Sequence, residues 1–355
     1  MMALLKAKRK VENMVNKNDD EIKEVIDLTP RTLDSLISRA KQIEDDSTDY
    51  MVENANSQNV RFNENAGLTF QTEKDGVLSL PISRYALGQL GTKIGVPSRY
   101  LEKCVRSGRI DLAQDNVNSW LEDFNKDLFI REYHGGIRGI LSSRYSVCDT
   151  PEILEAVDDA VDLDNYRVKG SFLNAERLHV RLIGKEMLPI DGEDLFSGLF
   201  IDSSDVGRSI LTVRFGIYKQ VCTNGLTIAK AGGVLFEQKH IGISASEFHD
   251  GLVASLGKVD ELSEHAVEWV KYAQSRSVHY DVNHLSKDDT EAFLNYIHNL
   301  TLLSKDSSQK VITLMQEKYD SSRWGLINSI TEVAQDFTLE KRLDLERIAG
   351  NLLVA

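Results

Sequence analysis

The sequence predicts an α+β fold: a central, mostly antiparallel sheet with embedded helices, followed by a helical C-terminal region. Two observations predict this class. Between residues 128 and 244, short β-type runs alternate with glycine-containing turns and one helical segment, a pattern typical of an antiparallel sheet with helices. From residue 245 onward, apolar residues recur every three to four positions, which is the period of a helix.

We expect four regions along the 355 residues. They are a charged, partly flexible N-terminal arm with one helix (1–59), a hairpin plus a helical pair (60–127), the α+β sheet core (128–244) and the helical C-terminal region (245–355). In the arm, Thr29 is the expected N-cap and Pro30 the first helical residue, ahead of an apolar stripe that includes Leu33 and Leu36.

The second region opens with a β-hairpin. Residues 68–71 and 77–80 are β-type runs, and the segment between them ends in Asp75-Gly76, a frequent hairpin turn. Ser83 then caps a helix, which indicates that the chain changes from strand to helix here.

The next residues, 86–103, are predicted to form a helix, a short turn and a second helix. This arrangement resembles a helix-turn-helix in outline, in which Ser98, Arg99 and Lys103 would reach a major groove. An ordinary α-hairpin has the same spacing, so both interpretations stay open.

The sheet core is predicted from its strands. Residues 128–133 and 137–141 form a hairpin around the turn His134-Gly135-Gly136, and Thr150-Pro151 opens a helix. Further strands are expected at residues 178–183, 199–202 and 210–218.

The C-terminal region is predicted to be helical throughout. A stripe that begins at Phe248 marks its first helix, Ser286 precedes another, and residues 331–348 form the last. The helices of this region have more apolar positions on their faces than are needed to cover one small sheet, which indicates an interface in a homo-oligomer. Helices that cover the sheet would explain these apolar faces as well.

Charge and composition exclude some classes of protein. There are 42 lysines and arginines against 55 acids, a net charge of −13, which argues against a uniformly basic binder of nucleic acid or membranes. No apolar run reaches the ~18 residues of a membrane span. Cys104, Cys148 and Cys222 are far apart and have neither zinc nor disulfide spacing, so we expect a cytoplasmic protein with no membrane partner.

One stretch departs from the acidic average. Residues 206–241 contain five cations and one acid, with Phe215, Tyr218 and Phe236 between them. Cations interleaved with aromatic residues suit single-stranded nucleic acid, because phosphates take the charge and bases stack on the rings. The alternative is a strand that alternates exposed cations with buried aromatic residues.

A second cluster lies around the 128–141 hairpin. Arg131, Arg138 and Arg144 occur there with Tyr133 and Tyr145, and the position ahead of a helix suits phosphate capture at the helix N-terminus. Acidic residues in the first turn of that helix oppose this interpretation.

The known catalytic motifs are missing from the sequence. It contains no dinucleotide-binding, phosphate-loop, zinc-protease or nucleophile-elbow motif. Cys222 could be an activated thiol beside Lys219, but a buried small hydrophobe is the expected role. Asp202 and Asp205 could bind Mg²⁺ only with distant ligands. We therefore expect no catalytic residues, no cofactor and no bound metal.

Three segments together resemble a known family. They are residues 140–145 (ILSSRY), the 210–218 strand with the following residues 221–226 (VCTNGL), and residues 324–332 (WGLINSITE). In this order they are similar to the phage/plasmid-like family of domain of unknown function 932, from about residue 60 to the C-terminus. The resemblance implies a protein of phages or other mobile elements, often encoded near genes for DNA recombination or anti-restriction. It implies no catalytic residues.

The resemblance and the residues together favour a DNA-binding protein of a phage or mobile element, acting on single strands in recombination or replication without catalysis. It would work in the host cytoplasm. The expected phosphate and base contacts are Arg138, Arg144, Tyr145, Arg208, Arg214, Tyr218 and Lys219. The alternatives are an interaction protein that inhibits a host defence complex, whose acidic charge would suit a basic partner surface, and a metal-dependent nuclease or other hydrolase.

Overall fold

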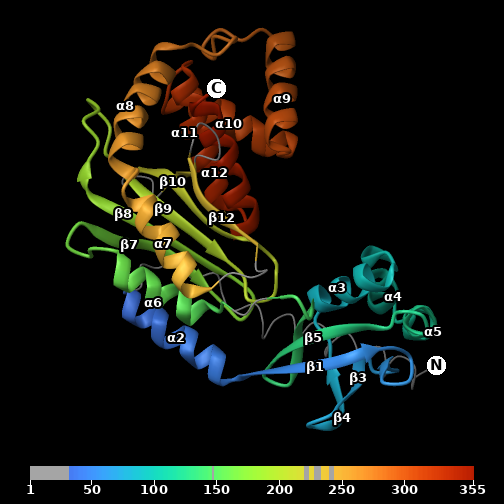
Figure 1. Ribbon diagram of the computed structural model, residues 1–355. Coiled ribbons are helices and arrows are strands. Elements are labelled where there is room, and N and C mark those ends of the chain that lie inside the picture. The colour runs from blue at the N-terminus through green and yellow to red at the C-terminus, as the bar shows by residue number, and fades with distance from the viewer. Residues whose placement is uncertain (1–31, 146–147, 220–223, 228–232, 240–243) are drawn as a thin grey trace.

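The structure is a computed structural model that describes residues 32–145, 148–219, 224–227, 233–239 and 244–355. It has two lobes (Figure 1). The main lobe contains a six-stranded sheet and its covering helices, and the inserted lobe, residues 47–142, contains two three-stranded sheets and a group of helices. Within the described sheets the strands pair antiparallel. The predicted α+β class is confirmed.

The inserted lobe interrupts the main lobe. Helix α2 (Leu33–Asp45) packs against α6 (Thr150–Ala160), and its buried Leu36 belongs to the main core. The chain then crosses to the inserted lobe and returns after residue 142. This division differs from the expected arm over residues 1–59, because α2 is part of the main lobe. Thr32 caps α2 by accepting a hydrogen bond from the Ser35 amide at 3.3 Å. The predicted N-cap Thr29 and the predicted first helical residue Pro30 lie outside the described residues.

The inserted lobe has its own hydrophobic core, formed by residues such as Phe62, Phe70 and Leu90. Its sheets have the orders β1-β5-β6 and β2-β3-β4. The two predicted hairpins are confirmed as β3–β4 and β5–β6, and Ser83 caps α3 as expected. The elements are β1 (Ser47–Ala55), β2 (Val60–Phe62), β3 (Gly67–Thr72), β4 (Gly76–Pro81), α3 (Arg84–Ile94), α4 (Ser98–Arg106), α5 (Ile110–Leu121), β5 (Lys126–Tyr133) and β6 (Gly136–Ser142).

The main sheet has the order β11-β10-β9-β8-β7, and β12 also pairs with β10. Its strands are β7 (Tyr166–Leu173), β8 (Leu178–Met187), β9 (Leu195–Ser203), β10 (Leu211–Lys219), β11 (Asn224–Thr227) and β12 (Val234–Gln238). Side chains alternate along each strand: Val213 and Phe215 of β10 enter the main apolar core, while Tyr218 lies in a small separate cluster with Phe200. We call this second side, which also carries arginines, the charged face of the sheet.

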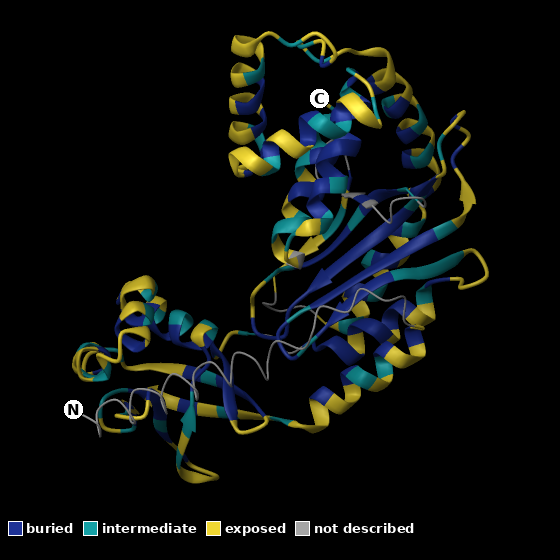
Figure 2. Ribbon diagram, turned by 180° about the vertical axis from the view of Figure 1, so that it is seen from behind, coloured by how far each residue is buried: buried dark blue, intermediate teal, exposed yellow. Residues whose placement is uncertain are grey.

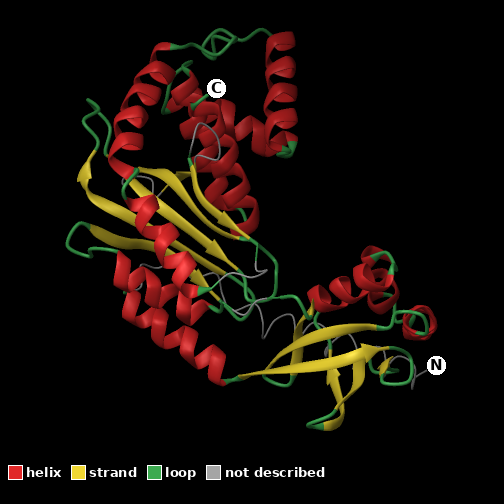
Figure 3. Ribbon diagram, in the orientation of Figure 1, coloured by secondary structure: helices red, strands yellow, loops and turns green. Residues whose placement is uncertain are grey.

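Helices cover the sheet on both sides (Figure 3). The C-terminal helices are α7 (Ala245–Leu256), α8 (Val259–Ser275), α9 (Lys287–Thr301), α10 (Lys305–Glu317), α11 (Arg323–Val333), a 3₁₀ turn (Ala334–Asp336) and α12 (Leu339–Leu353). Of these, α7, α8, α11 and α12 contact strands of the sheet, whereas α9 and α10 pack against α11, α12 and each other. Ser286 caps α9 as predicted, in a reciprocal capping box with Asp289. The predicted last helix at residues 331–348 is wrong, because Phe337 takes an extended conformation and separates α11 from α12.

Burial follows this layered arrangement. Figure 2 shows the central strands of the main sheet buried, with exposed residues on the outer faces of the helices, in the loops and at the ends of the outer strands. In the part of the chain that the structure describes, no helix is long and apolar enough to cross a membrane.

Candidate functional site

The seven predicted contact residues do not form one surface. Arg138, Arg144, Tyr145 and Arg208 lie near the junction of the two lobes, Arg214 and Tyr218 lie on the charged face of the main sheet, and Lys219 ends β10 beside α11. Arg138 and Tyr218 are each only 2% exposed. These two side chains therefore offer no accessible surface to a phosphate or a base.

Three of the other predicted cations are neutralised within the protein. Arg208 forms an ion pair with Glu176 at 2.5 Å, and its guanidinium also stacks on Tyr85. Arg214 pairs with Asp202 at 3.3 Å and Lys219 with Glu193 at 2.7 Å. The local positive charge counted over residues 206–241 is thus offset by acids from other strands and loops.

The remaining two predicted residues differ in exposure. Arg144 is exposed, and no described carboxylate lies within 4 Å of it. Tyr145 is partly buried and donates a hydrogen bond to the Ser204 carbonyl at 3.0 Å; burial raises the pKa of its hydroxyl. Cys222 lies outside the described residues.

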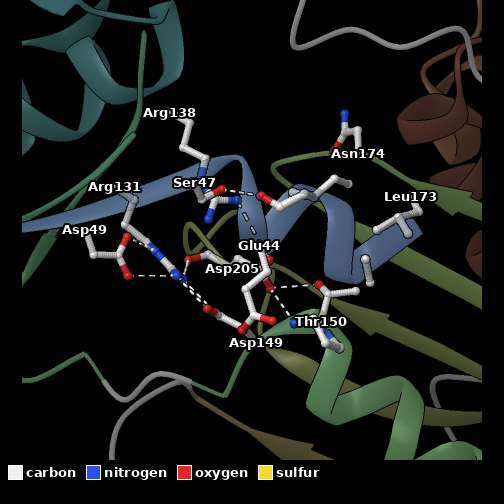
Figure 4. Close-up of a pocket in the computed structure, with 13 residues that line it drawn as sticks. Glu44, Ser47, Asp49, Arg131, Arg138, Asp149, Thr150, Leu173, Asn174 and Asp205 are labelled. Atoms are coloured by element: carbon white, nitrogen blue, oxygen red, sulfur yellow. Dashed lines mark hydrogen bonds and ion pairs between the residues drawn. The ribbon is translucent and has the colours of Figure 1, made fainter. Parts of the chain in front are cut away.

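A cavity of about 240 Å³ lies where the two lobes meet (Figure 4). Its wall is formed by α2, β1, β5, β6, the start of α6 and the β7–β8 and β9–β10 connections, and most of its side chains are polar. The polar lining residues are Glu44, Ser47, Asp49, Arg131, Arg138, Asp149, Thr150, Asn174 and Asp205.

Arg131 organises this cavity. All five of its N–H donors are used: Nε and Nη2 bind Asp49 at 2.9 and 3.0 Å, Nη1 and Nη2 bind Asp149 at 2.6 and 2.5 Å, and Nη1 binds the Asp205 carbonyl at 2.8 Å. Burial acts to lower the pKa of Arg131, but the two carboxylates outweigh it and raise the pKa. Arg131 is fully committed within the protein, so its role is to join the lobes.

Arg138 and Asp205 complete the junction. Arg138 donates to the Ala175 carbonyl and lies 3.8 Å from Asp205, and burial lowers its pKa. Asp205 accepts from the amide and hydroxyl of Thr150 at 3.1 and 2.8 Å. Burial, together with the charge of Asp149, raises the pKa of Asp205 to about 6. The described residues contain no group of three or more side chains placed to hold a metal ion.

The charged face of the sheet carries a chain of buried hydrogen bonds. Arg181 donates through Nε to His179 Nε2 at 3.1 Å and through Nη2 to Glu346 of α12 at 2.6 Å. Arginine can only donate, so Nε2 accepts and the imidazole proton sits on Nδ1, 3.0 Å from Asp202. Burial lowers the pKa of His179, which keeps the imidazole neutral. Asp202 lies on the neighbouring strand β9 and Glu346 on α12, so the spacing of these residues in the sequence does not reveal this chain of hydrogen bonds.

The Trp324 segment, which contributed to the family resemblance, meets Lys219. The Trp324 indole donates to Glu193 at 2.6 Å, and Asn328 Oδ1 lies 3.2 Å from Lys219 Nζ. Asn328 also donates to the Trp324 carbonyl at 2.8 Å. The cluster therefore fixes α11 against the end of β10.

The inserted lobe presents a different surface, in the segment that was predicted to form a helix, a short turn and a second helix. Residues 84–109 contain six cations and one acid, Glu102. Arg99, Lys103 and Arg109 are exposed, and no described carboxylate lies within 4 Å of them. A charge count over this segment would have found the signal from the sequence.

Aromatic residues accompany these cations. Trp120 of α5 is 56% exposed and Tyr100 of α4 is 39% exposed. The Trp120 ring lies over the α3–α4 turn, 4.0 Å from the Cβ position of Gly95. We call this set the basic helical surface: Arg99, Tyr100, Lys103, Arg106, Arg109 and Trp120.

Comparison with protein-family models matches residues 138–344 to Domain of unknown function (DUF932). The match spans more than half of the chain, so the chain belongs to this family, as the resemblance of its motifs predicted. No curated protein and no solved structure matches the chain. The matched region begins inside β6. It covers most of the main lobe and leaves the basic helical surface outside.

Proposed function

We propose that this chain is a non-catalytic DNA-binding protein that holds single strands on the basic helical surface. The observation that carries this proposal is the exposed charge of Arg99, Lys103 and Arg109, which have no carboxylate within 4 Å among the described residues. Their segment, residues 84–109, contains six cations and one acid on a protein of net charge −13, and that acid, Glu102, pairs with Arg84 and Arg106. On a protein with a negative net charge, a local basic surface binds phosphates at that surface alone, because the acidic remainder of the protein repels nucleic acid. Following the family resemblance, we place this activity in recombination or replication of a phage or other mobile element.

Charge pairing distinguishes this surface from residues 206–241, the segment that the sequence favoured for binding nucleic acid. Arg208, Arg214 and Lys219 each have a carboxylate partner within 3.3 Å. To bind a phosphate, each of these cations would have to give up that partner. Arg99 and Lys103 have no such partner to displace among the described residues.

The exposed rings favour single strands over a duplex. Each base of a single strand has an open π-face, and stacking on an aromatic side chain contributes about 1–3 kcal/mol per base. In a duplex the bases are already stacked on each other, so Trp120 and Tyr100 would have no such contact. The proposal therefore depends on the rings for strand preference and on the cations for affinity.

The test is fluorescence anisotropy of labelled oligothymidylate with the full chain, over a range of salt concentrations. Four phosphate contacts predict a log–log salt slope of about −3 for a single strand. The triple variant Arg99→Ala/Lys103→Ala/Arg109→Ala should lose about two units of this slope, because three cations are removed. The matched control removes three exposed cations of the main lobe, Lys258, Lys271 and Lys287, and should retain the slope.

Trp120→Ala tests the strand preference. It should weaken single-strand binding by about 1–3 kcal/mol and leave duplex binding unchanged. Binding that ignores salt, or a triple variant that binds like the wild type, would overturn the proposal. Tighter binding to a duplex, unaffected by Trp120→Ala, would overturn the assignment to single strands.

A further inference from the structure

A second cluster of cations lies on the charged face of the main sheet, around the ring of Tyr218. Lys169 Nζ lies 5.9 Å from the Tyr218 ring centre. Arg167 lies 5.3 Å from the ring centre of Phe196, which is paired with Tyr218 between β9 and β10. Arg181 lies 5.2 Å from the ring centre of Phe200, in the same small apolar cluster, and Arg342 joins it through the shared partner Glu346. Strands β7 and β8 and helix α12 thus bring four cations to the cluster around this ring.

The carboxylates near this ring do not balance the cations. Glu346 is shared by two of them, Arg181 at 2.6 Å and Arg342 at 3.0 Å. Among the described residues, no carboxylate lies within 4 Å of Arg167 or Lys169. Arg167 and Lys169 therefore add two positive charges that no described carboxylate within 4 Å offsets.

One hydrogen-bond donor of the cluster is also unsatisfied. Arg167 Nε is buried and has no hydrogen-bond partner, while its guanidinium lies 5.3 Å from the Phe196 ring centre. Leaving a buried N–H unpaired costs free energy, more so when the group is charged. The cluster therefore lacks an acceptor that carries negative charge, and Arg167 and Lys169 are only partly buried, so a ligand can approach them.

We propose that Arg167, Lys169, Arg181 and Arg342 form a site for a phosphate group with at least two negative charges. A polyanion of this kind accepts several hydrogen bonds and neutralises more charge than a carboxylate does. Its source is either a free phosphate compound, such as pyrophosphate or a nucleoside triphosphate, or the terminal phosphate of a DNA strand. The site lies in the main lobe, separate from the basic helical surface, so either proposal can fail without the other.

Isothermal titration calorimetry of the full chain tests the site. The ligands are pyrophosphate, ATP, and short oligothymidylates with and without a 5′-phosphate. Saturable binding of pyrophosphate or ATP identifies a free phosphate ligand, and binding of only the 5′-phosphorylated oligomer identifies a strand end; both support the site. Arg167→Ala/Lys169→Ala should weaken that binding about tenfold or more. The control Lys271→Ala/Lys287→Ala removes the same amount of charge from α8 and α9 and should leave the binding unchanged.

Circular dichroism and thermal melting establish that each variant is folded. If the double variant does not fold, Lys169→Gln provides the same comparison, because Lys169 is partly exposed and replacing it leaves no buried cavity. The proposal is overturned if neither pyrophosphate nor ATP binds saturably at millimolar concentration and the 5′-phosphate adds nothing to oligothymidylate binding. It is also overturned if a folded variant binds these phosphate ligands as tightly as the wild type.

Discussion

Arg131 is the side chain whose removal should most weaken the joint between the lobes. It is 2% exposed and makes five hydrogen bonds, four of them to the carboxylates of Asp49 and Asp149. Asp149 is itself 6% exposed. Arg131→Met therefore leaves a buried carboxylate without its cation, which costs about 3–5 kcal/mol. Arg131→Lys keeps the charge but loses the two-pronged geometry, so its loss should be intermediate.

Urea unfolding, followed by circular dichroism and tryptophan fluorescence, measures this loss. The control Arg144→Met removes an exposed arginine near the same junction and should change the free energy of unfolding by less than about 0.5 kcal/mol. Adding Asp149→Asn to Arg131→Met should recover part of the loss, because the uncompensated charge is gone. A loss below about 1 kcal/mol, or a double variant no more stable than Arg131→Met, would refute the assignment of Arg131 as the joint.

Two further predictions concern the same junction and the basic helical surface. The pKa of Asp205 is about 6 in the folded protein, against an ordinary 3.8, so the folded protein binds the proton more tightly than the unfolded chain does. The contribution of Asp205 to the free energy of unfolding should therefore fall by ~3 kcal/mol as the pH rises from about 4 to about 6. Asp205→Asn should remove this fall, and an unchanged curve of stability against pH would contradict the assignment. Gly91→Ala places a Cβ 2.8 Å from the Val96 carbonyl and 2.9 Å from Leu101, so we expect α3 and α4 to separate at a cost of about 1–3 kcal/mol in thermal melting. Gly88→Ala, with its nearest contact at 3.5 Å, should be neutral or stabilising by up to about 1 kcal/mol, and equal effects of the two would rule out the close helix contact.

Strands bounded by turn residues could be predicted from the sequence. The β3–β4 hairpin was predicted from Asp75-Gly76, and the β5–β6 hairpin from the glycines after His134. Strand β7 was missed, because Arg167 and Lys169 give it a polar pattern and the pairing is irregular between Val168 and Gly170. Strand β1 was missed for a related reason: it is an edge strand whose residues are mostly exposed.

The candidate site was harder to predict than the fold, because charge pairing is a tertiary property. Counting charges along the chain found the cations Arg208, Arg214 and Lys219. It could not show that Glu176, Asp202 and Glu193 neutralise them, since Glu176 and Glu193 lie outside the counted segment and Asp202 is on the neighbouring strand. The same count over residues 84–109 would have identified the basic helical surface, where the charge is local to one helical hairpin and its flanks.

The inserted lobe has a mechanical consequence that follows from how it is attached. The chain leaves the main lobe between α2 and β1 and returns between β6 and α6, so the inserted lobe is attached at both of its ends. Asp49 lies near the outgoing end and Asp149 near the returning end, and Arg131 holds both. Because one side chain holds both ends of the inserted segment, neither end can move away from the junction without breaking its bonds to Arg131. A load on α4, such as a bound strand under tension, would therefore be transmitted to α2 and α6 of the main lobe through Arg131.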